Sequence, residues 1–128
     1  MTAGDRFEIP VRPRRYYPRA GGVEYQGDTT FTLTPAVDRS EPTLRDLVET
    51  VLAAGPYRFG DFIDLPMPLW LVRDGETSDT FRISVRDGTI RLHVLPATDS
   101  TGLEAFYDRV CRRSDCAWSV SRDVTEDR

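Results

Sequence analysis

Catalytic chemistry needs nucleophiles, bases or metal ligands at workable spacing, and this chain offers few of them. Its single histidine, His93, could act as a general base only beside a nucleophile or an orienting carboxylate. The residue expected opposite it across a hairpin is Arg82, whose positive charge would lower the pKa of the imidazole without making it a useful base. We therefore expect His93 to lie at a surface or an interface.

Carboxylates offer a second route to catalysis. Asp74, Glu76 and Asp79 cluster in one polar segment, and Asp61 and Asp64 stand among apolar residues. Paired carboxylates can perform acid–base catalysis, but nothing in the sequence brings these within reach of one another. Their spacing is also wrong for a calcium-binding EF-hand. A small enzyme with a carboxylate or histidine site stays open as an alternative, with no catalytic residue assigned.

Cys111 and Cys116 are the two cysteines of the chain. Together with one histidine at this spacing they match no zinc signature, and no CxxC redox motif is present. Cys111 falls on the apolar stripe of an expected helix, which favours a buried thiol. A disulfide between the two is sterically feasible but uncommon in a reducing compartment. Glycine-rich phosphate loops are absent as well, so we predict no metal and no cofactor.

All 17 basic residues are arginine, because the chain contains no lysine. Schiff-base chemistry and the phosphate-binding lysine of a P-loop are therefore excluded. Every positive charge is a planar guanidinium suited to carboxylates, phosphates and aromatic faces. The net charge of -4 is unevenly placed, since residues 1–22 carry +3 and the remainder carries -7. A basic arm on an acidic body predicts either an anionic partner or docking of the arm on its own body.

Residues 1–22 are expected to form this extended basic arm, with a short strand over residues 7–9. Three prolines in residues 10–18 preclude a regular helix. Arginines interleaved with tyrosines could pair with phosphates and stack on bases, so nucleic-acid binding through the arm is an alternative function. The residues concerned are Arg12, Arg14, Arg15, Tyr16, Tyr17 and Arg19. The acidic body favours self-docking, because most nucleic-acid-binding domains are basic.

Length and composition predict one globular domain. The chain has 128 residues, of which 39% are hydrophobic and 30% charged, as is usual for soluble proteins. Neither a long apolar run nor an apolar segment after the start is present, so we expect a cytoplasmic protein without a membrane partner. Residues 23–124 would form the domain, and residues 125–128 a frayed tail.

Two helices and several strands follow from local signals. Apolar stripes predict helices from Ser40 to about residue 54 and from Ser100 to about residue 111, each capped by its serine. Strands are expected over residues 23–26, 29–34, 69–73, 80–86, 89–95 and 117–122, with a hairpin turn at Gly27-Asp28 and an irregular connection over residues 57–68. This order predicts an α+β fold: an antiparallel sheet of four to six strands with two helices on one face, a ferredoxin-like sandwich or a close variant.

The Asp87-Gly88 turn is the strongest hairpin signal, and it sets a register. Arg82 then faces His93 and Ile83 faces Leu92, so the apolar side chains of both strands share one face. The opposite face, extended by the strand over residues 69–73, mixes leucine with arginine. We predict that this face is either covered by the arm and the irregular connection, or is a contact surface formed by Leu69, Leu71, Arg82, Arg86, Arg91 and His93.

These features favour a small, soluble, non-catalytic binding or regulatory module. It would act through protein–protein contacts or self-association on the Leu/Arg face, because a freely solvated sheet face would not need leucines.

Overall fold

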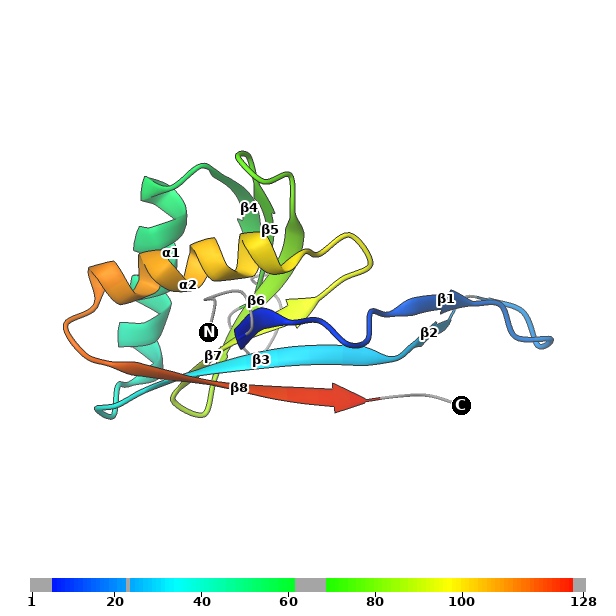
Figure 1. Cartoon of the computed structure of the whole chain (residues 1–128), viewed down its shortest axis with the longest axis horizontal. Coiled ribbons are helices and arrows are strands. Elements are labelled where there is room, and N and C mark those ends of the chain that lie inside the picture. Colours follow the sequence, from blue (N-terminus) through cyan, green and yellow to red (C-terminus); the bar gives the residue numbers. More distant parts are fainter. Residues whose placement is uncertain (1–5, 23, 62–68, 126–128) are drawn as a thin grey trace.

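A computed structural model describes residues 6–22, 24–61 and 69–125 (Figure 1). It is an α+β structure in which two helices cover one face of an open, six-stranded antiparallel sheet, as the order of elements predicted. The main sheet has the strand order β4-β5-β6-β7-β3-β8, and β1 and β2 form a separate two-stranded hairpin. The elements are β1 (Arg14–Tyr16), β2 (Glu24–Gln26), β3 (Asp28–Pro35), α1 (Glu41–Ala54), β4 (Tyr57–Asp61), β5 (Leu69–Asp74), β6 (Thr80–Arg86), β7 (Thr89–Val94), α2 (Ser100–Arg113) and β8 (Trp118–Thr125).

The β6–β7 hairpin has the predicted register. Asp87 and Gly88 adopt φ values of 53° and 72°, the two consecutive positive values that a type I′ turn requires. Arg82 therefore faces His93, and Ile83 faces Leu92. The expected pairing of β5 with β6 is also confirmed, with Leu71 opposite Arg82. The odd-numbered residues of β6 consequently point toward the helices and are fully buried.

Both helices bury the apolar stripes that their sequences predicted. In α1 the Ser40 hydroxyl accepts a hydrogen bond from the Thr43 amide at 3.3 Å, which confirms Ser40 as the N-cap. The predicted cap of α2 is wrong by one residue. Asp99 has the extended backbone of an N-cap and accepts from the Ser100 amide at 2.8 Å, whereas the Ser100 hydroxyl donates to the Phe7 carbonyl. Ser100 is thus engaged by a distant part of the chain.

The segment before β1 is bound to the body of the protein. The expected strand over residues 7–9 is wrong, because Phe7 lies in a tight turn and is fully buried. Its ring centroid is 5.1 Å from that of Phe31 and 5.5 Å from that of Tyr107. Arg6 pairs with Glu104 at 2.7 Å, and Arg12 Nε donates to the Thr98 carbonyl at 3.1 Å. These contacts hold residues 6–12 against the helix-bearing side of the sheet.

The predicted hairpin at Gly27-Asp28 is wrong. β2 pairs with β1 instead, and the chain reverses between them, where Gly21 and Gly22 supply two consecutive positive φ values of 94° and 84°. At the predicted turn, Gly27 has a positive φ of 84° but Asp28 does not, and the chain passes from β2 to β3 without a reversal. A β-carbon at Gly27 would lie 2.6 Å from Val11 Cγ1, so the glycine also permits a close approach. The β1–β2 hairpin projects from the body of the protein (Figure 1).

One strand, β4, was not expected, and another, β8, is longer than expected. Residues 57–61 of the predicted irregular connection form β4, which pairs with β5, and residues 62–68 lie outside the described residues. At the other edge, β8 extends past the expected end at residue 122 through Thr125, because β3 begins at Asp28 and provides partners for Val124 and Thr125. Residue 125 of the predicted frayed tail is therefore in a strand, and residues 126–128 lie outside the described residues.

Gly102 provides a test of how α2 is attached. A β-carbon there would lie 2.1 Å from Asp79 Oδ2, which accepts a hydrogen bond from the Gly102 amide at 2.6 Å. Gly→Ala in a helix normally stabilises by about 1 kcal/mol. We expect Gly102→Ala to lower the free energy of unfolding by about 1–3 kcal/mol instead, through this overlap. Urea denaturation, with Thr101→Ala as the exposed control, measures the difference. A gain in stability for Gly102→Ala would contradict the packing described.

Candidate functional site

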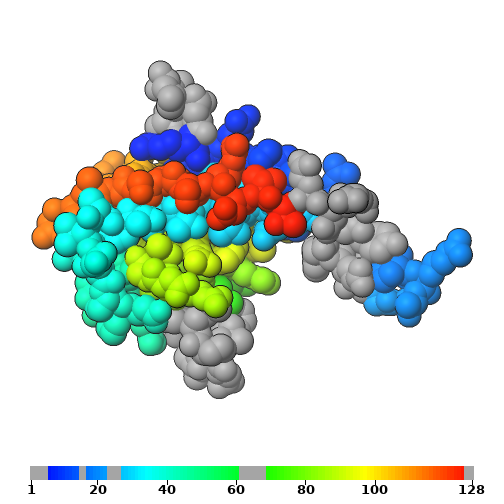
Figure 2. Space-filling view, turned by 90° about the horizontal axis from the view of Figure 1, so that it is seen from below, coloured from blue at the N-terminus to red at the C-terminus, as the bar shows by residue number. Residues whose placement is uncertain are grey.

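The face of the sheet opposite the helices is the candidate site. Figure 2 views the protein from this side and shows β8, β3 and β7 side by side with no helix across them. Strand pairing divides the face into two chemically different halves. The β3–β8 half carries hydroxyls and two carboxylates, and its residues are Asp28, Thr30, Thr32, Thr34, Ser119, Ser121, Asp123 and Thr125. The β4–β7 half carries Arg58, Gly60, Leu69, Leu71, Arg73, Arg82, Ser84, Arg91 and His93.

The β4–β7 half is basic although the protein is acidic. Cross-strand pairs place Arg58 opposite Arg73 and Leu71 opposite Arg82 on this half. Its open-face strand positions include no carboxylate, whereas the whole chain has a net charge of -4. Clustered arginines make the local electrostatic potential positive even though the whole protein is negative, and a positive potential attracts anionic groups.

A groove of about 820 Å³ lies on this half. It is lined by Pro13, Gly27, Asp28, Leu69, Leu71, Thr80, Arg82, Ser84, His93, Val94, Leu95 and Pro96. Leucines from two elements give it an apolar part, and Pro13 brings the segment before β1 to its edge. Leu71 is 39% exposed. Its cross-strand neighbour is Gly60, which has no side chain to cover it and has open space beside it.

His93 lies in the groove, opposite Arg82 as expected, and bonds to a residue that the sequence argument did not select. Its Nε2 is 2.8 Å from the hydroxyl oxygen of Ser84, which is buried. Burial lowers the pKa of His93, and Arg91 and Arg82 lower it further, whereas Asp28 opposes them. In the Ser-His-Asp arrangement a carboxylate orients the imidazole, and among the described residues no carboxylate is bonded to the His93 ring. The Ser84–His93 pair thus presents a neutral polar group within a basic groove.

The six residues predicted for the contact face separate into two groups. Leu69, Leu71, Arg82 and His93 line the groove. Arg86 and Arg91 lie at the turn end of the same face, where both guanidiniums approach Asp87 Oδ2, at 3.7 and 3.6 Å.

Sequence reasoning missed Ser84, Gly60 and Pro13. The predicted register contained the signal for Ser84, because it is the diagonal neighbour of His93 on the same face. Gly60 and Pro13 had no such signal, since their positions depend on β4 and on the docking of residues 6–12.

The residues predicted for the arm are not gathered into one surface. Arg12 is tethered to the body through Thr98. Arg14, Tyr17 and Arg19 are exposed on the projecting hairpin, with Tyr17 65% exposed. Arg15 and Tyr16 belong to β1, where their backbones pair with Tyr25 and Glu24.

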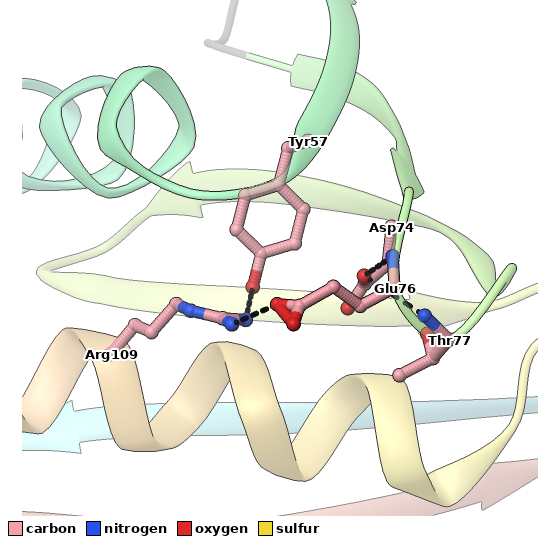
Figure 3. A network of polar contacts seen from close by, with 5 residues as sticks. All are labelled: Tyr57, Asp74, Glu76, Thr77 and Arg109. Carbon is pink, nitrogen blue, oxygen red and sulfur yellow. Dashed lines mark hydrogen bonds and ion pairs between the residues drawn. The ribbon is translucent and has the colours of Figure 1, made fainter.

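The loop carboxylates serve as structural acceptors (Figure 3). Asp74 Oδ1 accepts from the amides of Glu76 and Thr77 at 2.8 and 3.2 Å and so closes the β5–β6 loop. Glu76 pairs with Arg109 at 3.0 Å, and Arg109 donates to the Tyr57 hydroxyl at 2.7 Å. This network links the loop to α2 and to β4.

Of the other three carboxylates singled out in the sequence, Asp79 is the one whose side-chain contacts the structure describes. Asp79 accepts from the Gly102 amide, as described above, and burial raises its pKa. Asp61 ends β4, and Asp64 lies outside the described residues. Asp99 and Asp74 are near enough to raise the pKa of Asp79 further.

Other candidate chemistry is limited. Cys111 packs half-buried against the core, and both cysteines are free thiols. Within residues 6–22, 24–61 and 69–125, no three His, Cys, Asp or Glu side chains gather as a metal site would require. Neither helix in the described part of the chain is long and apolar enough to cross a membrane.

Comparison with known proteins adds no match: no family model, no curated protein and no solved structure is similar to this chain. The function must therefore be argued from the site itself.

The lowered pKa of His93 predicts a pH-dependent stability. Because the folded protein disfavours the imidazolium, the contribution of His93 is complete above its unfolded pKa of about 6.5 and is lost as the pH falls below that value. The free-energy difference between wild type and His93→Gln should therefore shrink on acidification, as measured by urea denaturation from about pH 8 to pH 5. The raised pKa of Asp79 affects both proteins equally and cancels. Parallel pH profiles for the two proteins would contradict this reading of the groove.

Proposed function

We propose that this protein is a non-catalytic binding module whose groove takes an extended, acidic segment of a partner protein. The observation that supports this most directly is Leu71, which is exposed on the β4–β7 half, where the open-face strand positions carry arginines and no carboxylate. An uncovered leucine on a sheet face costs solubility, and a partner's apolar side chain would remove it from water.

The chemistry of the groove favours a ligand with aliphatic side chains flanked by carboxylates. Leu69, Leu71 and Leu95 offer an apolar contact, which usually contributes most of the affinity. Arg82 and Arg73 on the same face can each bind a carboxylate through two parallel hydrogen bonds. A volume of about 820 Å³ suits a few residues of a peptide rather than a folded domain.

We also propose that the core of the fold is a ferredoxin-like sandwich with added strands. The order β8-β3-β7-β6, with α1 between β3 and β6 and α2 between β7 and β8 along the chain, supports this proposal. On this reading β4 and β5 extend the sheet next to β6. This extension carries Gly60 and Leu71, so the groove is built partly on added strands.

The proposed function is tested with two labelled peptides, one alternating leucine with glutamate and one alternating leucine with lysine. Fluorescence anisotropy should show binding of the glutamate peptide that weakens with salt, because arginines attract it. Gly60→Val should weaken this binding about tenfold or more by covering Leu71, a loss of about 1.4 kcal/mol. The open space at Gly60 and the β-propensity of valine should keep the fold intact.

Thr34→Val is the matched control, because it adds the same side chain to the hydroxyl half of the same face. It should bind the glutamate peptide like wild type. Arg82→Glu should weaken the glutamate peptide and strengthen the lysine peptide. Equal binding of both peptides, or no effect of Gly60→Val, would refute the proposal.

The projecting hairpin supports nucleic acid as a second candidate ligand. Tyr17, Arg14 and Arg19 are all exposed on this hairpin, so the tyrosine could stack on a base while the guanidiniums contact phosphates. Wild type should then shift single-stranded probes in a gel at low salt, and Arg14→Ser with Arg19→Ser should reduce the salt dependence of binding by about one unit of slope per lost contact. Absence of a shift at low salt would remove this candidate.

A further inference from the structure

The outer edge of β8 is an unusually regular strand edge. All eight residues of β8 pair with β3, from Asp28 opposite Thr125 to Pro35 opposite Trp118. In the described part of the chain no other backbone segment pairs with β8, and the N-terminal segment reaches it only through the Arg122 side chain, which donates to the Glu8 carbonyl at 3.0 Å. Its far side therefore presents a row of backbone donors and acceptors that another strand could pair with.

Two of the devices that usually protect such an edge, a proline and a bulge, are missing from β8, although Arg122 on its helix side is bound to Glu8 of the N-terminal segment. The strand contains no proline, and its ladder with β3 runs without a bulge. Its only charges are Arg122 and Asp123, which have opposite signs. Val124 is 39% exposed at its end. We infer that this edge binds the same edge of a second copy of the chain, forming a two-fold dimer with a continuous sheet.

The sequence of β8 is complementary to itself in one register. Residues opposite each other in an antiparallel pair share a face of the sheet. For the helices of both copies to lie on the same face, one residue must therefore face its own copy, and the two-fold axis passes midway between them. With the axis at Ser121, Ser119 faces the partner's Asp123 on the open face. On the helix face Trp118 lies opposite the partner's Val124, an aromatic–aliphatic pair that occurs twice. This register covers the exposed valine of both copies.

Neighbouring registers are worse. An axis at Arg122 or at Asp123 places like charges directly opposite each other, which destabilises a strand pair. An axis at Val120 pairs a shorter stretch and leaves Val124 beyond the end of the partner's strand. Ser121 is the position that avoids both defects.

The test uses charge at the two-fold axis. Ser121 is exposed, so Ser121→Arg and Ser121→Glu should fold as monomers without loss. Wild type should sediment at about twice the chain mass of 14.5 kDa at high protein concentration. Each variant alone should weaken the dimer about tenfold or more, because two like charges meet at the axis. An equimolar mixture of the two variants should restore the dimer, since arginine then meets glutamate.

The control is Thr101→Arg, which adds an exposed charge on α2 away from β8 and should dimerise like wild type. A wild type that stays monomeric at all concentrations would overturn the inference. So would variants that dimerise unchanged, or a mixture that stays monomeric. Gly60→Val should dimerise normally, so failure of this inference and failure of the proposed peptide site are separate results.

Discussion

Two residues with left-handed backbone, Asp87 and Gly88, hold β6 and β7 in a single register, and both faces of the sheet depend on this register. Because side chains alternate along a strand, a slip of one residue would move Ile83 and Leu92 into water and bring Arg82 and His93 under the helices. Such a slip would bury charges without partners, and this would cost far more free energy than the left-handed backbone of the turn does. The hairpin therefore acts as the reference from which the other strands are placed.

Each strand added beside this hairpin extends the same division of side chains. β5 pairs with β6 so that Trp70 and Val72 join the core, and β4 then pairs with β5. On the core side the aromatic rings of Phe81 and Phe106 meet edge to face, at 5.9 Å between centroids. On the open side the same additions bring leucine and arginine together. The dry core and the basic groove are thus two consequences of one pairing pattern.

The groove is open because neither a side chain at position 60 nor residues 6–12 cover it. Glycine at position 60 leaves Leu71 uncovered, where almost any other strand residue would cover it. The segment that might have lain across this face is committed elsewhere, because Phe7 is buried on the helix side and Arg12 is bound to Thr98. Only Pro13 reaches the edge of the groove. The basic charge of the arm therefore does not fill the site, and the projecting hairpin carries it away from the body.

Predictions from sequence succeeded where a local signal had no competitor. The apolar stripes of α1 and α2 and the Asp87-Gly88 turn belong to this class. They failed where a distant contact outweighed local preference. Ser100 would cap a helix in isolation, but its hydroxyl bonds to the Phe7 carbonyl, and Asp99 takes the cap. Gly27-Asp28 resembles a hairpin turn, yet Gly21 and Gly22 make the reversal.

The sequence by itself determined which residues of β6 and β7 face each other and which share a side, because alternation and turn geometry are properties of neighbouring residues. It thereby placed Leu71, Arg82 and His93 on one surface. Only the tertiary structure decided that Gly60 lies beside Leu71, that Ser84 bonds to His93, and that β8 stands at an edge. Those outcomes depend on strand order and on contacts between residues far apart in the chain, and no local pattern encodes the packing that selects them.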